Sequence, residues 1–159
     1  MTERLDYTAQ SPAIFQAYLN FSMATHDSAI ERPIIDLVNI RASQMNGCAF
    51  CLDMHVKEAA IHGERPLRLH HVAIWRESTM FSARERACLA WTEALTRLPD
   101  GGVSDGLYAA TREHLSEKEI TDLTAAIMAI NGWNRVGIAF NTEPGSKDDV
   151  FGLRKSGLS

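Results

Sequence analysis

Apolar residues recur every three or four positions along most of the chain, which is the spacing of one face of a helix. The pattern predicts helices over about residues 12–23, 33–46 and 48–62, with a short further helix after Pro66. Prolines stand at the expected starts of the first two helices, and Gly47 is a typical stop for the second. No stretch alternates clearly between apolar and polar residues with the period of two that marks a strand.

The second half of the chain carries two capping boxes, in which a serine is followed three residues later by a glutamate. The first is Ser82-Ala-Arg-Glu85 and the second is Ser116-Glu-Lys-Glu119, and each precedes a run with helical spacing. A shorter helix is expected between them, over about residues 104–115. We therefore predict an all-α fold, a single-domain helical bundle of six or seven helices.

The predicted bundle covers residues 1–141, and residues 142–159 form a polar C-terminal tail that contains proline and glycine. One interpretation of the tail is a loosely held terminus. The other is a segment that docks on a neighbouring subunit through Val150, Phe151 and Leu153.

Composition and charge narrow the class of protein. A chain of 159 residues fits one domain, and it is large enough to fold without a metal or a disulfide. Its net charge of −4 disfavours nucleic acids and anionic membranes as partners. The N-terminus has no signal-peptide pattern, and no apolar run approaches the ~18–20 residues of a spanning helix. We expect a cytoplasmic protein, and there a close cysteine pair is more often catalytic or metal-binding than structural.

Cys48, Cys51 and His55 form the candidate chemical site. Their separations of three and four place all three side chains on one face of a helix. Because Gly47 ends the preceding helix, Cys48 lies where the free N–H groups and the dipole of the next helix stabilise a thiolate. His55, one turn beyond Cys51, is placed to accept its proton. The helix start thus favours Cys48 as the nucleophile, the histidine spacing favours Cys51, and the choice stays open.

An upstream carboxylate is the candidate partner of the histidine. If the helices over 33–46 and 48–62 form an antiparallel hairpin, Asp36 lies within ~3 Å of the level of His55 along the axis. A carboxylate at that level can orient an imidazole directly or through a water. We therefore expect Asp36 to face His55.

The main alternative from the residues alone is a zinc site. Cys48, Cys51, His55 and either Asp36 or His62 supply the four ligands that zinc takes. The sequence has no second CxxC or HxxxH motif, and a domain of this size needs no metal to fold. We therefore favour redox chemistry, and interpret His62 as a helix-end residue that interacts with the dipole.

The sequence around the cysteines resembles the alkylhydroperoxidase D-like (AhpD-like) proteins of the carboxymuconolactone decarboxylase superfamily. The resemblance begins with the motif Ser43-Gln-Met-Asn-Gly-Cys-Ala-Phe-Cys-Leu-Asp-Met-His55. The stretch 85–96 is similar to the following helix of that family, and Asn131-Gly-Trp-Asn-Arg135 is similar to its late signature. The likeness extends from about residue 15 to residue 140 in the same order.

The resemblance implies an all-α fold that assembles as a homo-oligomer, a trimer or a hexamer. It also implies reduction of hydroperoxides, organic ones included, through a Cys48–Cys51 disulfide that a protein or lipoyl-type dithiol reopens. In such proteins the histidine and an upstream carboxylate deprotonate the second cysteine, and these roles fall on His55, Asp36 and Cys51. No cofactor and no metal are implied.

Two residues depart from the family pattern. Asp36 stands where the family usually has glutamate, and Phe50 stands where some relatives carry a histidine between the cysteines. A general disulfide reductase or redox sensor is therefore the first alternative function. A zinc-holding interaction module is the alternative from another class. Lactone decarboxylation ranks last, because the cysteine pair has no evident part in it.

Overall fold

The computed structural model describes residues 2–158 of the chain. Over that range it contains nine α-helices, three short 3-10 helices and no β-strand. The predicted all-α fold is confirmed, and the helix count exceeds the six or seven expected. The two additional helices, α1 (Tyr7–Gln10) and α9 (Asp148–Phe151), are single turns, too short to show the apolar periodicity by which longer helices are recognised.

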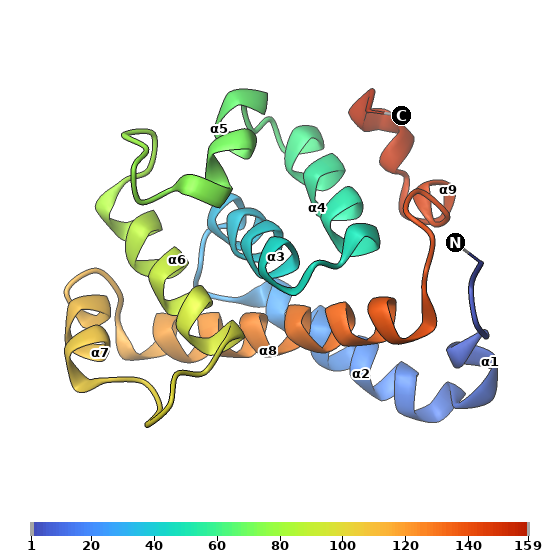
Figure 1. Cartoon of the computed structure of the whole chain (residues 1–159), viewed down its shortest axis with the longest axis horizontal. Helices are drawn as coiled ribbons and strands as arrows, with labels where there is room; N and C mark the ends of the chain where they lie inside the picture. Colours follow the sequence, from blue (N-terminus) through green and yellow to red (C-terminus); the bar gives the residue numbers. More distant parts are fainter. Residues whose placement is uncertain (1, 159) are drawn as a thin grey trace.

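Helix α3 (Arg32–Asn46) lies at the centre of the molecule (Figure 1). It forms an antiparallel hairpin with α4 (Ala49–Ile61), and it also packs against α6 (Ala83–Thr96) and α8 (Glu117–Phe140). The side chains at the middle of α3 are fully enclosed by these neighbours. They are Leu37, Val38, Ile40 and Ala42.

The remaining helices cover the flanks of this centre. Helix α2 (Pro12–Ala24) lies along α8, and α7 (Asp105–Arg112) contacts α6 and α8 (Figure 1). Helix α5 (Pro66–His71) links α4 to the turn before α6. The 3-10 helices are η1 (Thr25–Asp27), η2 (Val72–Ile74) and η3 (Leu153–Ser156). Within residues 2–158, no helix combines the length and the apolar character needed to cross a membrane.

The predicted helix ends are confirmed at three positions. Gly47 follows α3 in the left-handed conformation, with φ of 71°, which turns the chain directly into α4. The capping box of Ser82 and Glu85 has both of its hydrogen bonds at the start of α6. The box of Ser116 and Glu119 is equally complete at the start of α8.

The C-terminal tail packs on α4 of its own chain. Leu153 is only 2% exposed, and η3 lies against α4. The Lys57 ammonium on α4 donates to Asp53 at 2.8 Å and to Asp148 of the tail at 2.7 Å. The tail is thus held through at least one buried apolar side chain and one ion pair. Docking on a neighbouring subunit stays a prediction for the exposed Val150 and Phe151.

We expect Asp148→Asn to loosen the tail, because it removes the charge that pairs with the buried Lys57 ammonium. A charge-assisted hydrogen bond of this kind contributes about 1–2 kcal/mol. Limited proteolysis should cut after residue 142 faster in the variant, and the free energy of unfolding should fall by a similar amount. Asp149→Asn is the matched control, because Asp149 pairs with Arg154 at an exposed position where ion pairs contribute little. Equal cleavage rates in both variants would argue against this role for Asp148.

Candidate active site

The two cysteines meet at the turn between α3 and α4. Cys48 is the N-cap residue of α4, and its Sγ accepts the backbone N–H of Cys51 at 3.3 Å. The Cys48 and Cys51 sulfur atoms lie 2.6 Å apart. Both residues are buried, with 2% and 1% of their surface exposed. The expected position of the CxxC motif at a helix start is therefore confirmed, and the pair lies below the surface.

The surroundings of the two sulfurs make them chemically unequal. The hydrogen bond between the two sulfurs lowers the pKa of Cys48 to about 7, against the opposing effect of burial. The Cys51 backbone N–H and the Asn134 side chain lower it further. The same sulfur contact, together with burial, raises the pKa of Cys51. Cys48 is thus the more acidic sulfur of the pair, and Cys51 holds its proton more firmly.

Helix α8 forms the wall behind the sulfurs. A Cβ atom on Gly137 would lie 3.0 Å from the Cys48 sulfur and 3.6 Å from the Cys51 sulfur. The absence of a side chain at Gly137 therefore lets α8 approach the cysteine pair closely.

Asn134, one turn earlier on α8, is completely buried and belongs to an amide network. Its Nδ2 donates to Ser43 Oγ at 3.0 Å, and its Oδ1 accepts from Asn46 Nδ2 at 2.9 Å. Asn46 also donates to Asn131 Oδ1 at 2.9 Å. The network fixes the end of α3 against α8 and so holds the turn that carries Cys48. In the sequence, Asn134 is marked by its place in the stretch Asn131–Arg135, which resembles the late signature of the family, but that stretch does not indicate its role.

His55 lies on α4, one turn beyond Cys51, and is buried. Its carboxylate partner is not the expected one. Its Nδ1 lies 2.7 Å from Glu58 Oε2, one turn further along α4. Asp36 lies instead 2.6 Å from Nδ1 of His62, and Arg32 lies 3.2 Å from its other oxygen. The prediction that Asp36 faces His55 is therefore wrong.

The error has a geometric cause. Helical side chains tilt toward the N-terminus of their own helix. In an antiparallel hairpin this tilt moves the Asp36 side chain away from the turn and the His62 side chain toward it. Asp36 therefore meets a residue further along α4 than a count of backbone levels gives. The sequence signal that was missed is Glu58, three residues after His55 on the same helix face.

The two carboxylates differ in their ionisation. Burial raises the pKa of Asp36, although His62 and Arg32 act in the opposite direction. Burial also opposes ionisation of Glu58, but the hydrogen bond and charge of His55, with help from Arg32 and His62, bring its pKa below the ordinary value. The interface therefore contains one carboxylate with a raised pKa, Asp36, and one with a lowered pKa, Glu58.

We expect Glu58→Gln to change how stability depends on pH. Because the pKa of Glu58 is lower in the fold than its ordinary value of 4.5, its carboxylate stabilises the fold above that pH and loses this effect as pH falls through the folded pKa. The free energy of unfolding of the wild type should exceed that of the variant by on the order of 1 kcal/mol at pH 7, and this difference should vanish in acid. Denaturant unfolding of both proteins between pH 3 and 7 measures it. Glu77→Gln, at an exposed position, should give no such pH-dependent difference.

The third cysteine lies outside this arrangement, and the four ligands of the zinc alternative do not converge within it. Cys88 is buried in the apolar core of α6, and burial raises its pKa to about 12, so it packs as a small apolar residue. Among residues 2–158, no three side chains of histidine, cysteine, aspartate or glutamate converge as metal ligands. Asp36 and His62, the alternative fourth ligands, are hydrogen bonded to each other.

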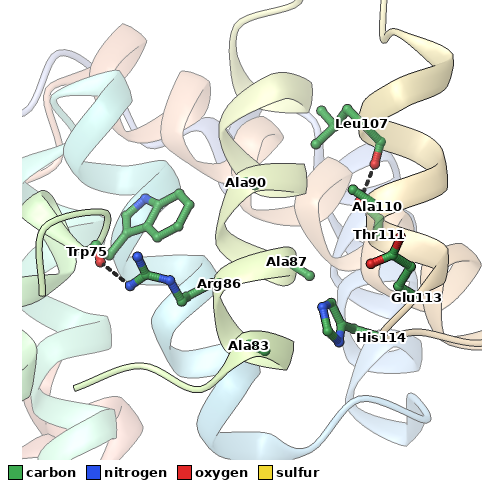
Figure 2. Close-up of a pocket in the computed structure, with 10 residues that line it drawn as sticks. All are labelled: Trp75, Ala83, Arg86, Ala87, Ala90, Leu107, Ala110, Thr111, Glu113 and His114. Atoms are coloured by element: carbon green, nitrogen blue, oxygen red, sulfur yellow. Dashed lines mark hydrogen bonds between the residues drawn. The ribbon is translucent and has the colours of Figure 1, made fainter. Parts of the chain in front are cut away.

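A surface hollow of about 310 Å³ lies between α6 and α7, away from the cysteines (Figure 2). Alanines of α6 and α7 form much of its lining, and Arg86 and His114 lie at its edge. The Arg86 guanidinium donates to the backbone carbonyls of Trp75, Arg76 and Ser78. Arg86 therefore holds the turn before α6 together. Because the hollow has no cysteine in its lining, the cysteine pair remains the candidate active site.

An all-helical domain with a buried CxxC pair at a helix start, and a histidine one turn later, defines the class of this protein. Residues 12–94 match the model of the carboxymuconolactone decarboxylase family, and the chain belongs to that family. YdfG, an uncharacterized protein of Bacillus subtilis, is 38% identical over 147 residues, which cover 92% of this chain and 100% of YdfG.

Solved structures agree with the fold. A protein of unknown function from Agrobacterium tumefaciens, provisionally described as the antioxidant defence protein AhpD, is 38% identical and superposes with a TM-score of 0.86. That match covers 90% of this chain and 98% of the other. The debrominase Bmp8 with 2,3,4-tribromopyrrole shares the fold at 14% identity and a TM-score of 0.78, over 94% of this chain and 77% of its own. The fold is thus AhpD-like, and it also occurs in an enzyme described as a debrominase.

Proposed function

We propose that this protein is a thiol-dependent peroxidase that reduces hydroperoxides through a Cys48–Cys51 dithiol/disulfide cycle. The observation that carries the proposal is the pair of unequal sulfurs 2.6 Å apart at the start of α4. A peroxidase of this kind needs a thiolate to attack oxygen and a neighbouring thiol to close a disulfide. Cys48, with its pKa of about 7, supplies the first, and Cys51 supplies the second.

The chemistry proceeds in two balanced steps. The Cys48 thiolate attacks one peroxide oxygen and becomes a sulfenic acid, while the O–O bond breaks and the leaving alkoxide takes a proton. The Cys51 thiol then displaces hydroxide from the sulfenic sulfur, which forms the disulfide and releases water. His55, oriented by Glu58, is the group that supplies and receives protons in these steps. This order gives the first attack to Cys48, one of the two alternatives that the sequence left open.

The cycle needs a second substrate, a dithiol that reopens the disulfide by exchange. A protein dithiol or a lipoyl-type group fits this role. Phe50 packs beside the cysteine pair, and apolar surroundings of this kind suit organic hydroperoxides. The active form in this proposal is a cytoplasmic homo-oligomer, a trimer or hexamer, for which exposed apolar residues on α2 and α8 offer contact surfaces. These residues are Ile14, Met23, Met128 and Ile138.

The test is a thiol count by mass spectrometry before and after one equivalent of cumene hydroperoxide. We expect rapid loss of two thiols, with a Cys48–Cys51 disulfide and an intact Cys88 thiol. A Cys88→Ser variant should behave identically, because Cys88 lies outside the site. Unchanged thiols would reject the peroxidase, and turnover of protein disulfides in their place would favour the disulfide reductase. One zinc per chain in the purified protein would favour the interaction module.

A further inference from the structure

One face of α4 carries four titratable side chains in a row. Cys51, His55, Glu58 and His62 follow one another at separations of four, three and four, so they form a single row along the helix. The row begins at the buried end of α4, where Cys51 lies, and ends at the C-cap residue His62. At 1.5 Å per residue it is about 16 Å long. The expected site contained only its first two members.

The groups that face this row come from neighbouring elements. Arg32 and Asp36 approach from α3. The Asp36 Oδ2 atom lies 2.6 Å from His62 Nδ1. His26 of η1 lies near enough for the charges of Arg32, Glu58 and His55 to act on it. Lys57 and its carboxylate partners lie on the opposite face of α4, about half a helical turn away. The charged groups that face the row therefore come from α3 and η1, and the Lys57 group lies apart from them.

The proton balance of the cycle requires a route of this kind, and this step rests on the proposed function. A thiolate, a thiol and a hydroperoxide give a disulfide, an alcohol and water only if one further proton is taken up. Reduction of the disulfide by a dithiol returns the thiolate and the thiol and releases one proton. The sulfurs are 2% and 1% exposed, so direct exchange with bulk water is obstructed. One proton must therefore cross the protein in each half of the cycle.

We propose that the row along α4 is the proton path between the cysteine pair and solvent, with His62 as its outer end and Asp36 as the residue that positions His62. The exposed fractions of the side chains support this direction, at 11% for His55 and 33% for His62. Each histidine is held through Nδ1 by a carboxylate, Glu58 for His55 and Asp36 for His62. Nδ1 of each ring can therefore exchange a proton with its carboxylate, and Nε2 is left to exchange one toward the cysteine pair in His55 and with solvent in His62.

The Asp36 carboxylate has an oxygen that is free to accept a proton. Asp36 is buried, and its Oδ1 has Arg32 as an ionic neighbour at 3.2 Å but no hydrogen-bond partner in the described chain. A buried carboxylate oxygen with a free lone pair beside an imidazole can accept a proton transiently. Asp36 therefore acts through His62 and the path, and not on the sulfurs themselves.

The test is a single-turnover oxidation of the reduced protein by cumene hydroperoxide in weak buffer, with the disulfide quantified over time. We expect His62→Ala to slow disulfide formation on the order of 10- to 100-fold. Added imidazole should restore most of the rate, because His62 is partly exposed and its removal leaves room for the free base. His70→Ala is the matched control, an exposed histidine on α5, and should have the wild-type rate with or without imidazole. Asp36→Asn should flatten the pH profile of the rate and keep His62 in place.

The outcomes separate this proposal from the proposed function. If the wild type forms no disulfide with peroxide, the peroxidase itself is rejected. If the wild type reacts and His62→Ala matches its rate and pH profile, the peroxidase stands and the path through His62 is overturned. A slow His62→Ala variant that imidazole does not restore also overturns the path, because it indicates a purely structural effect. Restoration by imidazole in His26→Ala and not in His62→Ala would place the outer end at η1, which contradicts the proposal.

Discussion

Replacing Cys48 by serine is expected to abolish reaction with hydroperoxide, with a loss of about a thousandfold or more. Serine keeps the N-cap hydrogen bond to the Cys51 backbone, so α4 should still form. Its hydroxyl does not ionise near neutral pH, so the group that attacks the peroxide oxygen is missing. Cys51 does not replace it, because its burial, which the substitution leaves in place, raises the pKa of the Cys51 thiol. Stopped-flow kinetics of peroxide consumption measures the loss.

Cys51→Ser should behave differently, although it also prevents disulfide formation. The Cys48 thiolate should react once with peroxide and stop at the sulfenic acid, which a dimedone-type probe traps. The variant should therefore consume one equivalent of peroxide and become labelled at Cys48. Labelling of Cys51 in the Cys48→Ser protein, with no reaction of Cys51→Ser, would reverse the proposed order of attack. Circular dichroism of both variants checks that the helices are intact.

The largest expected loss of stability comes from Gly132→Ala. A Cβ atom at Gly132 would lie 1.8 Å from the Tyr18 hydroxyl and 2.5 Å from the adjacent ring carbon. The Tyr18 ring cannot give way freely, because its hydroxyl donates to the Ala129 carbonyl at 2.8 Å and its ring packs on Trp133. The substitution should therefore displace α2 from α8 and lower the free energy of unfolding by about 1–3 kcal/mol.

A double-mutant cycle tests whether the clash is the cause. In a Tyr18→Leu background the space opposite Gly132 is open, so Gly132→Ala should cost little or should stabilise α8. Gly106→Ala is the matched control in α7, because a Cβ there meets only Ser104 Oγ at 4.0 Å. That variant should stabilise the protein by about 0.5–1 kcal/mol. Equal losses for Gly132→Ala in both backgrounds would mean that Tyr18 is not the obstacle.

Much of the fold follows from local sequence signals. The capping boxes at Ser82 and Ser116 mark the starts of α6 and α8, and Gly47 marks the turn between α3 and α4. These signals are readable because a capping serine or a left-handed glycine acts within a few residues of itself. Single-turn helices such as α1 and α9 are not readable in this way. They depend on contacts with distant segments, such as the ion pair between Asp148 and Lys57.

The site residues also fall into two groups, those that local sequence signals predict and those that depend on distant segments. Cys48, Cys51 and His55 could be predicted because all three lie on one helix, where spacing fixes the face. Asn134 and Gly137 could not be assigned, because they reach the sulfurs from α8, almost 90 residues further along the chain. The carboxylate partner of His55 was misassigned for a related reason. A count of levels across a hairpin fixes neither the rotation of the helices nor the tilt of their side chains.

The sequence by itself determined the all-α class, the CxxC pair at a helix start and the histidine one turn below it. Only the tertiary structure decided which sulfur is the more acidic, because that depends on the approach of one sulfur to the other and of α8 to both. It also decided which carboxylate serves which histidine, Glu58 for His55 and Asp36 for His62. Helix starts and faces are set by neighbours in sequence, whereas pKa values and hydrogen-bond partners are set by neighbours in space.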